Sequence, residues 1–309
     1  MNFFDFGEVI EPNTQFVIIG IPWDYLTSIQ GPNSSLAPQK IRDITENLAL
    51  TTELGSKIPQ FKAVDLGDIK IETKNVDNNL KEIKNYINNI YKQKEDVVIV
   101  TIGGDHFCSF PVAKAVGDNR ENKKDFGMLI FDAHLDLYEE WDKSIYSHAT
   151  ISHRIYDLEY ITNKNLLIVG SRDIDIPELE IAEAEDIVHF DAHLLIKIGL
   201  KQYTDKIINF FKSSKVKDLY ISIDIDALDP SIAPATGFAI PGGFTYRELW
   251  QILKEIPNHF NVVGFDVVEV APNLDLPNNL TSNLAAKLII EFMDFIRNRK
   301  VNQENERKR

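Results

Sequence analysis

Three aspartates, Asp224, Asp226 and Asp229, stand within six residues in the stretch YISIDIDALDP. Apolar residues alternate through the segment 219–225, which predicts a buried strand ending among these acids. Buried carboxylates are costly unless they are paired or bound to a metal ion. Prolines and glycines follow the strand, so a bent backbone can turn Asp224 and Asp226 toward one cation. An acidic strand-to-loop transition in an acidic protein is the alternative interpretation.

A second group of candidate ligands lies in the stretch DAHLDLY, where Asp132, His134 and Asp136 occupy alternate positions. If this segment is extended, the three side chains project to the same side. Imidazole and carboxylate at this spacing favour a metal site over the alternative, a solvated acidic turn. His106 in GGDHF follows another apolar run and is a further candidate. Taken alone, a histidine there is more often a structural residue than a metal ligand.

Glu269 is a carboxylate in an apolar setting, the stretch DVVEVAP. Valines on both sides and a proline after them predict that its side chain is poorly solvated. Such a group needs a cationic partner, either a bound substrate or a structural Arg or Lys. The sequence leaves these two alternatives open.

The elements that position these residues are predicted from hydrophobic periodicity. Short apolar runs indicate strands at residues 16–19, 97–102, 128–131, 166–169, 187–190, 219–223 and 262–267. The clearest helical patterns cover residues 76–94, 194–211, 246–256 and 282–296. Alternating strands and helices predict a parallel sheet covered on both faces. Ligands bind such sheets beyond the carboxyl ends of the strands.

Domain organisation is predicted to be simple. The sequence contains no internal repeat and no linker-like break, so residues 1–296 are expected to form a single α/β domain. Residues 297–309, RNRKVNQENERKR, are polar and basic and are expected to be a frayed helix end or a disordered tail.

Four predicted strand ends therefore carry candidate ligands. The set comprises His106, Asp132, His134, Asp136, Asp224 and Asp226, with Glu269 nearby. Carboxylates outnumber imidazoles and thiolates are absent from the set, which favours manganese over zinc. Six ligands are too many for one tetrahedral ion but suit two ions that share bridging carboxylates. Two divalent ions would nearly neutralise the acids, leaving a site that favours a cationic substrate over a phosphate.

Composition narrows the function classes. The 309 residues are 44% hydrophobic and carry a net charge of −14, which argues against nucleic-acid and anionic-membrane partners. Cys108 is the only cysteine, so an intramolecular disulfide is impossible and a reducing cytoplasm is expected. The N-terminus has acids where a signal peptide would be basic and then apolar. Apolar runs stay well below the roughly 20 residues of a membrane span.

The motifs also carry a family resemblance. GGDH, DAHLD, SHAT, SIDIDALDP with its following PGG, and VVEVAP occur in the order and spacing of the ureohydrolases, the arginase and agmatinase family. The resemblance covers most of the chain, from GIPWD at Gly20 to Pro272. It implies a three-layer α/β/α sandwich with a mostly parallel, roughly eight-stranded sheet. It also implies two Mn²⁺ ions per chain and a homotrimer or homohexamer.

Position by position, the resemblance implies roles for the candidate residues. One manganese ion would be held by His106, Asp132, Asp136 and Asp224. The other would be held by Asp132, His134, Asp224 and Asp226, so Asp132 and Asp224 would bridge. Glu269 matches the carboxylate that engages the guanidinium group, and His148 matches a histidine that shuttles protons, with Asp136 as the proton donor. Asp105 and Asp229 are expected to bond locally instead of binding a metal.

Within that family, details favour agmatine as the substrate, cleaved to putrescine and urea. Tyr138 stands where arginases would place an asparagine that contacts the amino-acid end of arginine. Asp173 and Asp175 in SRDID are candidate contacts for a distal ammonium group, or else surface residues. Alternatives are another guanidino or amidino substrate, namely arginine, a guanidino acid, formiminoglutamate or aminopropylagmatine. A catalytically silent metal-binding subunit is the alternative from a different functional class.

Overall fold

The computed structural model describes residues 1–26, 33–72 and 75–307. Its strands form one eight-stranded sheet in the order β2-β1-β3-β8-β7-β4-β5-β6, and every neighbouring pair is parallel. The strands are β1 (Phe16–Ile21), β2 (Ala63–Asp68), β3 (Val98–Gly103), β4 (Phe126–Phe131), β5 (Leu166–Ser171), β6 (His189–Asp191), β7 (Asp218–Asp224) and β8 (Asn261–Val268). The predicted parallel sheet is confirmed.

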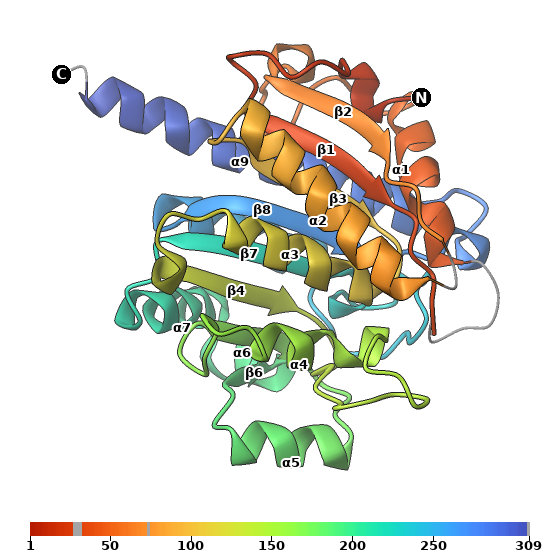
Figure 1. Ribbon diagram of the computed structural model, residues 1–309, viewed down its shortest axis with the longest axis vertical. Helices are drawn as coiled ribbons and strands as arrows, with labels where there is room; N and C mark the ends of the chain where they lie inside the picture. Colours follow the sequence, from red (N-terminus) through yellow and green to blue (C-terminus); the bar gives the residue numbers. More distant parts are fainter. Residues whose placement is uncertain (27–32, 73–74, 308–309) are drawn as a thin grey trace.

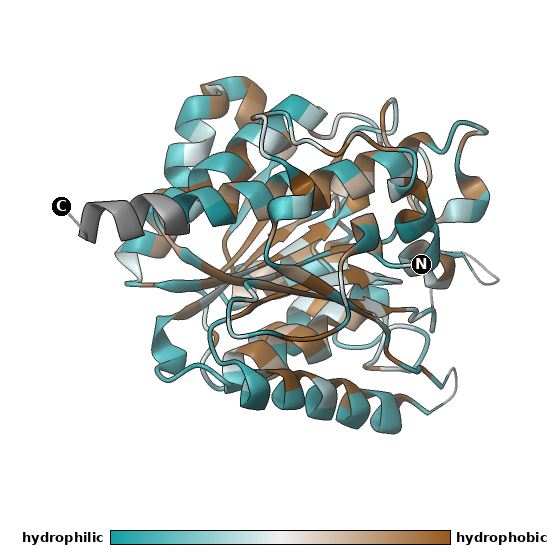
Figure 2. Cartoon of the chain, turned by 90° about the horizontal axis from the view of Figure 1, so that it is seen from above, coloured by the Kyte–Doolittle hydropathy of each residue, from teal (hydrophilic) through white to brown (hydrophobic). Residues whose placement is uncertain are grey.

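Helices cover both faces of this sheet: Figure 1 looks onto one covered face, and Figure 2 shows the sheet edge-on with helices on both sides. One face packs against α2 (Val76–Gln93), α3 (Ser109–Asp118), α4 (Ile151–Tyr156) and α5 (Ile176–Ala184). The other packs against α1 (Ala37–Thr45), α6 (Ala192–Ile198), α7 (Leu200–Ser213), α8 (Tyr246–Glu255) and α9 (Leu280–Arg307). The predicted three-layer α/β/α arrangement is thus confirmed.

The two apolar cores arise because side chains alternate along each strand. In β3, Val98, Val100 and Ile102 face the core that contains α9, whereas Ile99 faces the core that contains α2 and α3. All of these residues are at most 1% exposed. Burial on both faces explains why strands such as β1 and β4 have continuous apolar sequences instead of an alternating pattern.

The structure differs from the predicted elements in three places. The edge strand β2 was not predicted, because its sequence AVDLGD mixes polar and apolar residues. The predicted helix 194–211 is divided into α6 and α7 at Gly199, whose φ of 78° is incompatible with a continuous helix. The last helix continues past residue 296, into the segment expected to fray, and ends at Arg307.

None of the helices in the described ranges combines the length and the apolarity that crossing a bilayer requires.

The strand order has a direct consequence for the candidate ligands. The strands β3, β8, β7 and β4 lie side by side at the centre of the sheet. Since they are parallel, their carboxyl ends meet at one edge, where ligands bind in sheets of this kind.

Candidate metal centre and substrate cavity

The predicted ligands come together at the carboxyl ends of three of the four central strands, β3, β4 and β7. His106 follows β3 in a short 3-10 turn, and Asp132 is the first residue after β4. Asp224 ends β7, and Asp226 lies in the turn that follows it. Two groups of side chains are close enough to hold an ion, namely His106 with Asp132 and Asp224, and His134 with Asp132 and Asp226.

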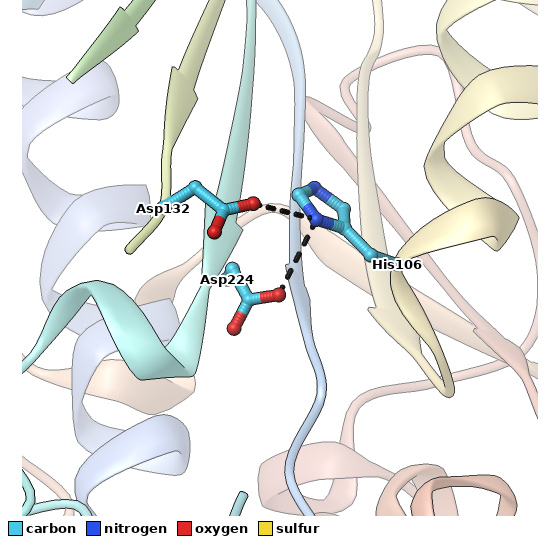
Figure 3. Close-up of side chains that lie close together, drawn as sticks. All are labelled: His106, Asp132 and Asp224. Carbon is cyan, nitrogen blue, oxygen red and sulfur yellow. Dashed lines mark ion pairs between the residues drawn. The ribbon is translucent and has the colours of Figure 1, made fainter. Parts of the chain in front are cut away.

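The first group is centred on His106 (Figure 3). Its Nδ1 lies 2.9 Å from Asp132 Oδ2, 2.9 Å from Asp136 Oδ2 and 3.3 Å from Asp224 Oδ2. His106 Nδ1 and Asp132 Oδ2 are buried and have no hydrogen-bond partner within the described ranges. Leaving such an atom unsatisfied costs about 1–3 kcal/mol. Lone pairs converging from buried carboxylates and an imidazole are what a divalent ion requires, so the residues fit a metal ion.

The second group shares one residue with the first. His134 Nδ1 lies 3.1 Å from Asp226 Oδ2 and 3.3 Å from Asp132 Oδ1. Asp132 therefore contributes a different oxygen to each group, which is the geometry of a bridging carboxylate. Asp224 groups only with the His106 set. Its bridging role remains a prediction.

Backbone N–H groups hold the ligand carboxylates in place. The Oδ1 atom of Asp224 accepts from the N–H of Asp226 at 2.8 Å, and Oδ1 of Asp226 accepts from the N–H of Ala133 at 3.0 Å. Asp132 Oδ1 likewise accepts from the N–H of His134 at 2.7 Å. In Asp224 and Asp226, one oxygen is thus committed to the backbone, and the other faces the centre.

The carboxylates of this cluster outnumber its histidines, so the side chains alone do not balance the negative charge. Burial and the neighbouring Asp132 raise the pKa of Asp136 well above its ordinary value, and burial with Asp226 does the same for Asp224. Burial alone would lower the pKa of His106, but the neighbouring carboxylates of Asp132, Asp136 and Asp224 raise it well above the ordinary value. In the metal-free protein, these side chains therefore retain protons at the positions that metal ions would occupy.

Glu269 lies directly after β8 and adopts a left-handed backbone conformation with φ of 60°. Its Oε1 accepts from the N–H of His106 at 2.8 Å, which fixes it beside the centre. Burial, together with the charge of Asp105, raises the pKa of Glu269 to about 8. No Lys or Arg among the described residues forms a salt bridge with it. The structural-partner alternative therefore loses support, while contact with a guanidinium group stays a prediction.

A cavity of about 310 Å³ opens beside the centre. Its lining is acidic and aromatic and comprises His134, Asp136, Tyr138, Trp141, His148, Ala149, Asp173, Ile174, Asp175, Glu178 and Phe238. Within the described ranges this lining includes neither Lys nor Arg, and it does not include Glu269. A ligand that enters the cavity meets carboxylates and ring faces, both of which favour a cation.

His148 lines this cavity from the short 3-10 turn formed by the SHAT motif. Its Nδ1 lies 2.7 Å from the backbone carbonyl oxygen of Leu26, to which it donates. Burial is the largest cause that lowers the pKa of His148, to about 4. The imidazole is therefore neutral near pH 7, and it can accept a proton at Nε2.

The two aspartates predicted to contact a distal ammonium group differ. Asp175 caps α5 and accepts a short hydrogen bond from the Tyr138 hydroxyl, so it is already engaged. The Asp173 side chain is 56% exposed and, among the described residues, forms an ion pair only with His134, at 3.7 Å from Nε2. Asp173 is therefore the freer carboxylate of the two.

Asp229 bonds within its own loop, as predicted, whereas Asp105 bonds within its loop and also to Tyr25, 80 positions away in sequence. The Asp105 carboxylate accepts from the N–H groups of Phe107 and Tyr25. The Asp229 carboxylate accepts from the N–H groups of Ser231 and Gly242. Both acids stabilise turns and stay outside the two ligand groups.

Sequence reasoning missed three polar residues near the centre. Ser222 and Asp266 lie on β7 and β8, and both are fully buried. An acid inside the apolar run VVGFDVV was the available signal for Asp266. Glu178 is also buried, and its carboxylate accepts from the N–H of Leu137, which supports the loop bearing Tyr138.

The fold and the site together define a class of protein, a three-layer α/β structure with a shared-carboxylate ligand cluster at the carboxyl ends of its central strands. The model of the Arginase family matches residues 14–294. The chain therefore belongs to the arginase family.

Named relatives refine this assignment. The chain is 30% identical over 286 residues to an agmatinase of Bacillus cereus, which covers 91% of each protein. It is 37% identical over 191 residues to the N(1)-aminopropylagmatine ureohydrolase of Thermus thermophilus, but that match spans only 60% of the relative and 62% of this chain. A formimidoylglutamase structure from Bacillus subtilis superimposes with a TM-score of 0.85 at 25% identity, covering 96% of this chain and 92% of that one.

Proposed function

We propose that this protein is a binuclear manganese hydrolase that cleaves a guanidino group to urea and an amine, with agmatine as substrate and putrescine as product. The observation that carries the proposal is the pair of ligand groups sharing Asp132 beside a cavity lined with acids and aromatic rings. The oxygen and imidazole donors suit manganese. Agmatine carries a guanidinium group at one end and an ammonium group at the other, so it matches this lining at both ends.

Two bound ions would lower the pKa of a shared water, from 15.7 in bulk toward about 7, and so supply the nucleophile. The chain's own residues then orient the substrate and move protons. Glu269 fixes the planar guanidinium by charge-assisted hydrogen bonds. The shared water would lose one proton when it ionises, and His148, neutral at rest, would pass that proton to solvent through the cavity. After the attack, Asp136 takes up the remaining proton of the water and delivers it to the departing amine. His148 then returns a proton from solvent, so the amine leaves as an ammonium group.

The cavity lining favours agmatine over the acidic alternatives. Arginine, guanidino acids and formiminoglutamate all carry a carboxylate at the far end. That carboxylate would face Asp173 and Asp175 with no Lys or Arg among the described lining residues to neutralise it. A cationic tail instead gains from Asp173 and from the rings of Trp141 and Phe238.

Aminopropylagmatine is a second candidate substrate, favoured by a specific observation. The rings at the cavity mouth are partly exposed, Trp141 at 39% and Phe238 at 45%. A longer polyamine tail can therefore extend past them toward solvent. The Thermus relative carries the name of this activity.

A catalytically silent subunit is disfavoured because the ligand set is complete. Both groups contain a histidine and two aspartates, and Glu269 is in place.

The proposal includes assembly as a homotrimer or homohexamer in the cytoplasm. Sedimentation analysis of the purified protein tests the assembly.

Urea release from the metal-depleted protein tests the reaction. We expect no urea from agmatine after chelation, and full activity after Mn²⁺ is restored. A panel of agmatine, aminopropylagmatine, arginine and guanidinobutyrate identifies the substrate. Turnover of arginine above both cationic candidates would contradict the substrate assignment.

Glu269→Gln separates ion binding from guanidinium binding. The neutral amide cannot form a charged pair with the guanidinium group, so turnover should be abolished while about two ions remain per chain. Metal analysis and urea assay on the same sample measure both quantities. Normal turnover by Glu269→Gln would exclude this residue as the guanidinium partner.

A further inference from the structure

Behind the metal centre lies a chain of buried hydrogen bonds that ends at Asp266. We propose that Asp266 acts through Ser222 as a positioning residue that holds the proton of His106 on Nε2, so that Nδ1 presents its lone pair to a metal ion. The inference rests on the proposed metal centre and goes beyond it, because it assigns a role to residues that do not contact the ions.

The geometry of the chain is continuous. His106 Nε2 lies 3.0 Å from Ser222 Oγ, and Ser222 Oγ lies 2.6 Å from Asp266 Oδ1. The Tyr220 hydroxyl donates to the other oxygen, Asp266 Oδ2, at 2.7 Å. All four side chains are fully buried.

Strand register explains why these residues meet. Ser222 on β7 and Asp266 on β8 are direct partners in the parallel ladder. Tyr220 precedes Ser222 by two positions, so it projects from the same face of β7 and its hydroxyl reaches Asp266. His106 approaches that face from the turn after β3.

The direction of each hydrogen bond follows from counting protons. A carboxylate only accepts, so the hydroxyl of Ser222 donates its single proton to Asp266. Ser109 Oγ is a longer alternative acceptor, at 3.2 Å. With its proton committed, Ser222 Oγ can only accept from His106, and the donor is the Nε2–H group. Hydrogen bonds from Ser222 and Tyr220 also oppose the rise in the pKa of Asp266 that burial causes.

The consequence concerns the other ring nitrogen. A neutral imidazole with its proton on Nε2 has a free lone pair on Nδ1. That atom is the one that faces Asp132, Asp136 and Asp224 and lacks a hydrogen-bond partner in the described structure. A proton on Nδ1 would instead block the first ion. Outer partners of this kind typically change metal affinity by about 10-fold to 100-fold.

The experiment is Asp266→Asn. An amide can donate to Ser222 Oγ, so the serine hydroxyl turns and donates to Nε2, and the imidazole proton moves to Nδ1. We expect Mn²⁺ affinity to fall by about 10-fold to 100-fold at one of the two sites and to stay unchanged at the other. Isothermal titration without substrate measures both affinities.

Three further measurements make the result decisive. Tyr220→Phe, which keeps the Ser222–Asp266 bond, should retain nearly wild-type affinity at both sites. Ser222→Ala should reproduce the loss and replaces Asp266→Asn if that variant does not fold. Nitrogen-15 spectra of the Zn²⁺-loaded wild-type protein should show His106 protonated at Nε2.

A folded Asp266→Asn or Ser222→Ala variant with two wild-type affinities would overturn the proposal, as would an Nδ1-protonated His106. Failure of the wild-type protein to bind a pair of ions would instead overturn the proposed function. The two failures are therefore distinguishable.

Discussion

Two buried clusters of charged residues occupy this sheet, and they differ in how their charges are satisfied. At one edge, Arg42 on α1 meets Asp65 and Asp68 of β2. Both oxygens of Asp65 are used: Oδ2 accepts from Arg42 Nε and the N–H of Phe3, and Oδ1 accepts from another guanidinium N–H and from the N–H of Gly67. At the centre, His106 Nδ1 and Asp132 Oδ2 lie close to each other, but neither buried atom makes a hydrogen bond to the described residues.

The difference shows how a structural cluster is told from a site. The Arg42 cluster is closed, because donors and acceptors from the chain itself match. The metal centre is open, because several carboxylates share a small volume with two imidazoles and no Lys or Arg joins either ligand group in the described ranges. An open cluster of this kind requires a ligand from outside the chain.

Asp224→Asn should produce the largest effect on activity. Losing a ligand of the first ion should reduce turnover by at least about 10³-fold, or roughly 4 kcal/mol of transition-state stabilisation. The metal-free variant should unfold at the same urea concentration as the metal-free wild type or a higher one, because burial and Asp226 already disfavour the charge of Asp224. Normal turnover with two ions bound would show that the centre is not open. Asp229→Asn, which alters only a turn, is the control.

Arg42→Met should have the opposite effect to Asp224→Asn: it should reduce stability and leave turnover unchanged. Removing the cation leaves Asp65 buried and uncompensated, which costs about 3–5 kcal/mol of unfolding free energy. Turnover per folded molecule should be unchanged. Urea unfolding followed by circular dichroism measures the loss. Arg247→Met, at an exposed ion pair with Glu53, is the matched control and should leave the midpoint unchanged. Equal unfolding midpoints for Arg42→Met and Arg247→Met would contradict the view that the Arg42 cluster stabilises the fold.

The pH dependence of stability should depend on the metal ions. Burial lowers the pKa of His134, but hydrogen bonds with Asp132 and Asp226 outweigh it and raise the value to about 12 in the metal-free protein. In the unfolded chain, histidine titrates near about 6.5. The stabilisation contributed by His134 is therefore complete below the pKa of histidine in the unfolded chain. It is lost as the pH rises from there through the pKa of His134 in the folded protein.

Metal-free protein should accordingly become less stable from about pH 6.5 upward. With Mn²⁺ present the trend should reverse in the same range, because fewer protons compete with the ions for the histidines. Urea unfolding with chelator and with Mn²⁺ measures the two slopes. Identical slopes would contradict the assignment of His134 as a ligand.

Asp173→Asn should have the smallest effect. This exposed carboxylate lacks a closed pairing, so it is available to a cationic tail. Pairs of exposed charges contribute about 0.2–1 kcal/mol, so KM for agmatine should rise by about twofold to fivefold with kcat unchanged. Asp157→Asn, at an acid already paired with Arg154, should leave KM unaffected. A larger rise for Asp157→Asn would place the cationic tail elsewhere.

Much of this architecture could be predicted from the sequence. Mostly apolar runs identified the central strands, since strands buried on both faces carry few polar residues before they end. The polar residues that follow those ends, such as His106 and Asp132, then marked the centre. The edge strand β2 escaped prediction because an edge strand tolerates the polar residues that obscure the pattern.

The hydrogen-bonded residues behind the metal ligands could not be predicted. Ser222 and Asp266 are 44 residues apart in sequence, and only the register between β7 and β8 brings them together. The division between α6 and α7 depends on the backbone angle of one glycine. Such features depend on tertiary pairing, and periodicity does not report it.

The order of the strands also governs when the centre can form during synthesis. Residues 98–131 supply β3 and β4, yet the two strands that lie between them, β7 and β8, come from residues 218–268. A growing chain that has reached β6 therefore holds two separate three-stranded pieces, each with an unpaired edge. Ribosomes must release the last third of the polypeptide before any ion can be captured, which makes metal loading a late event in the life of the molecule.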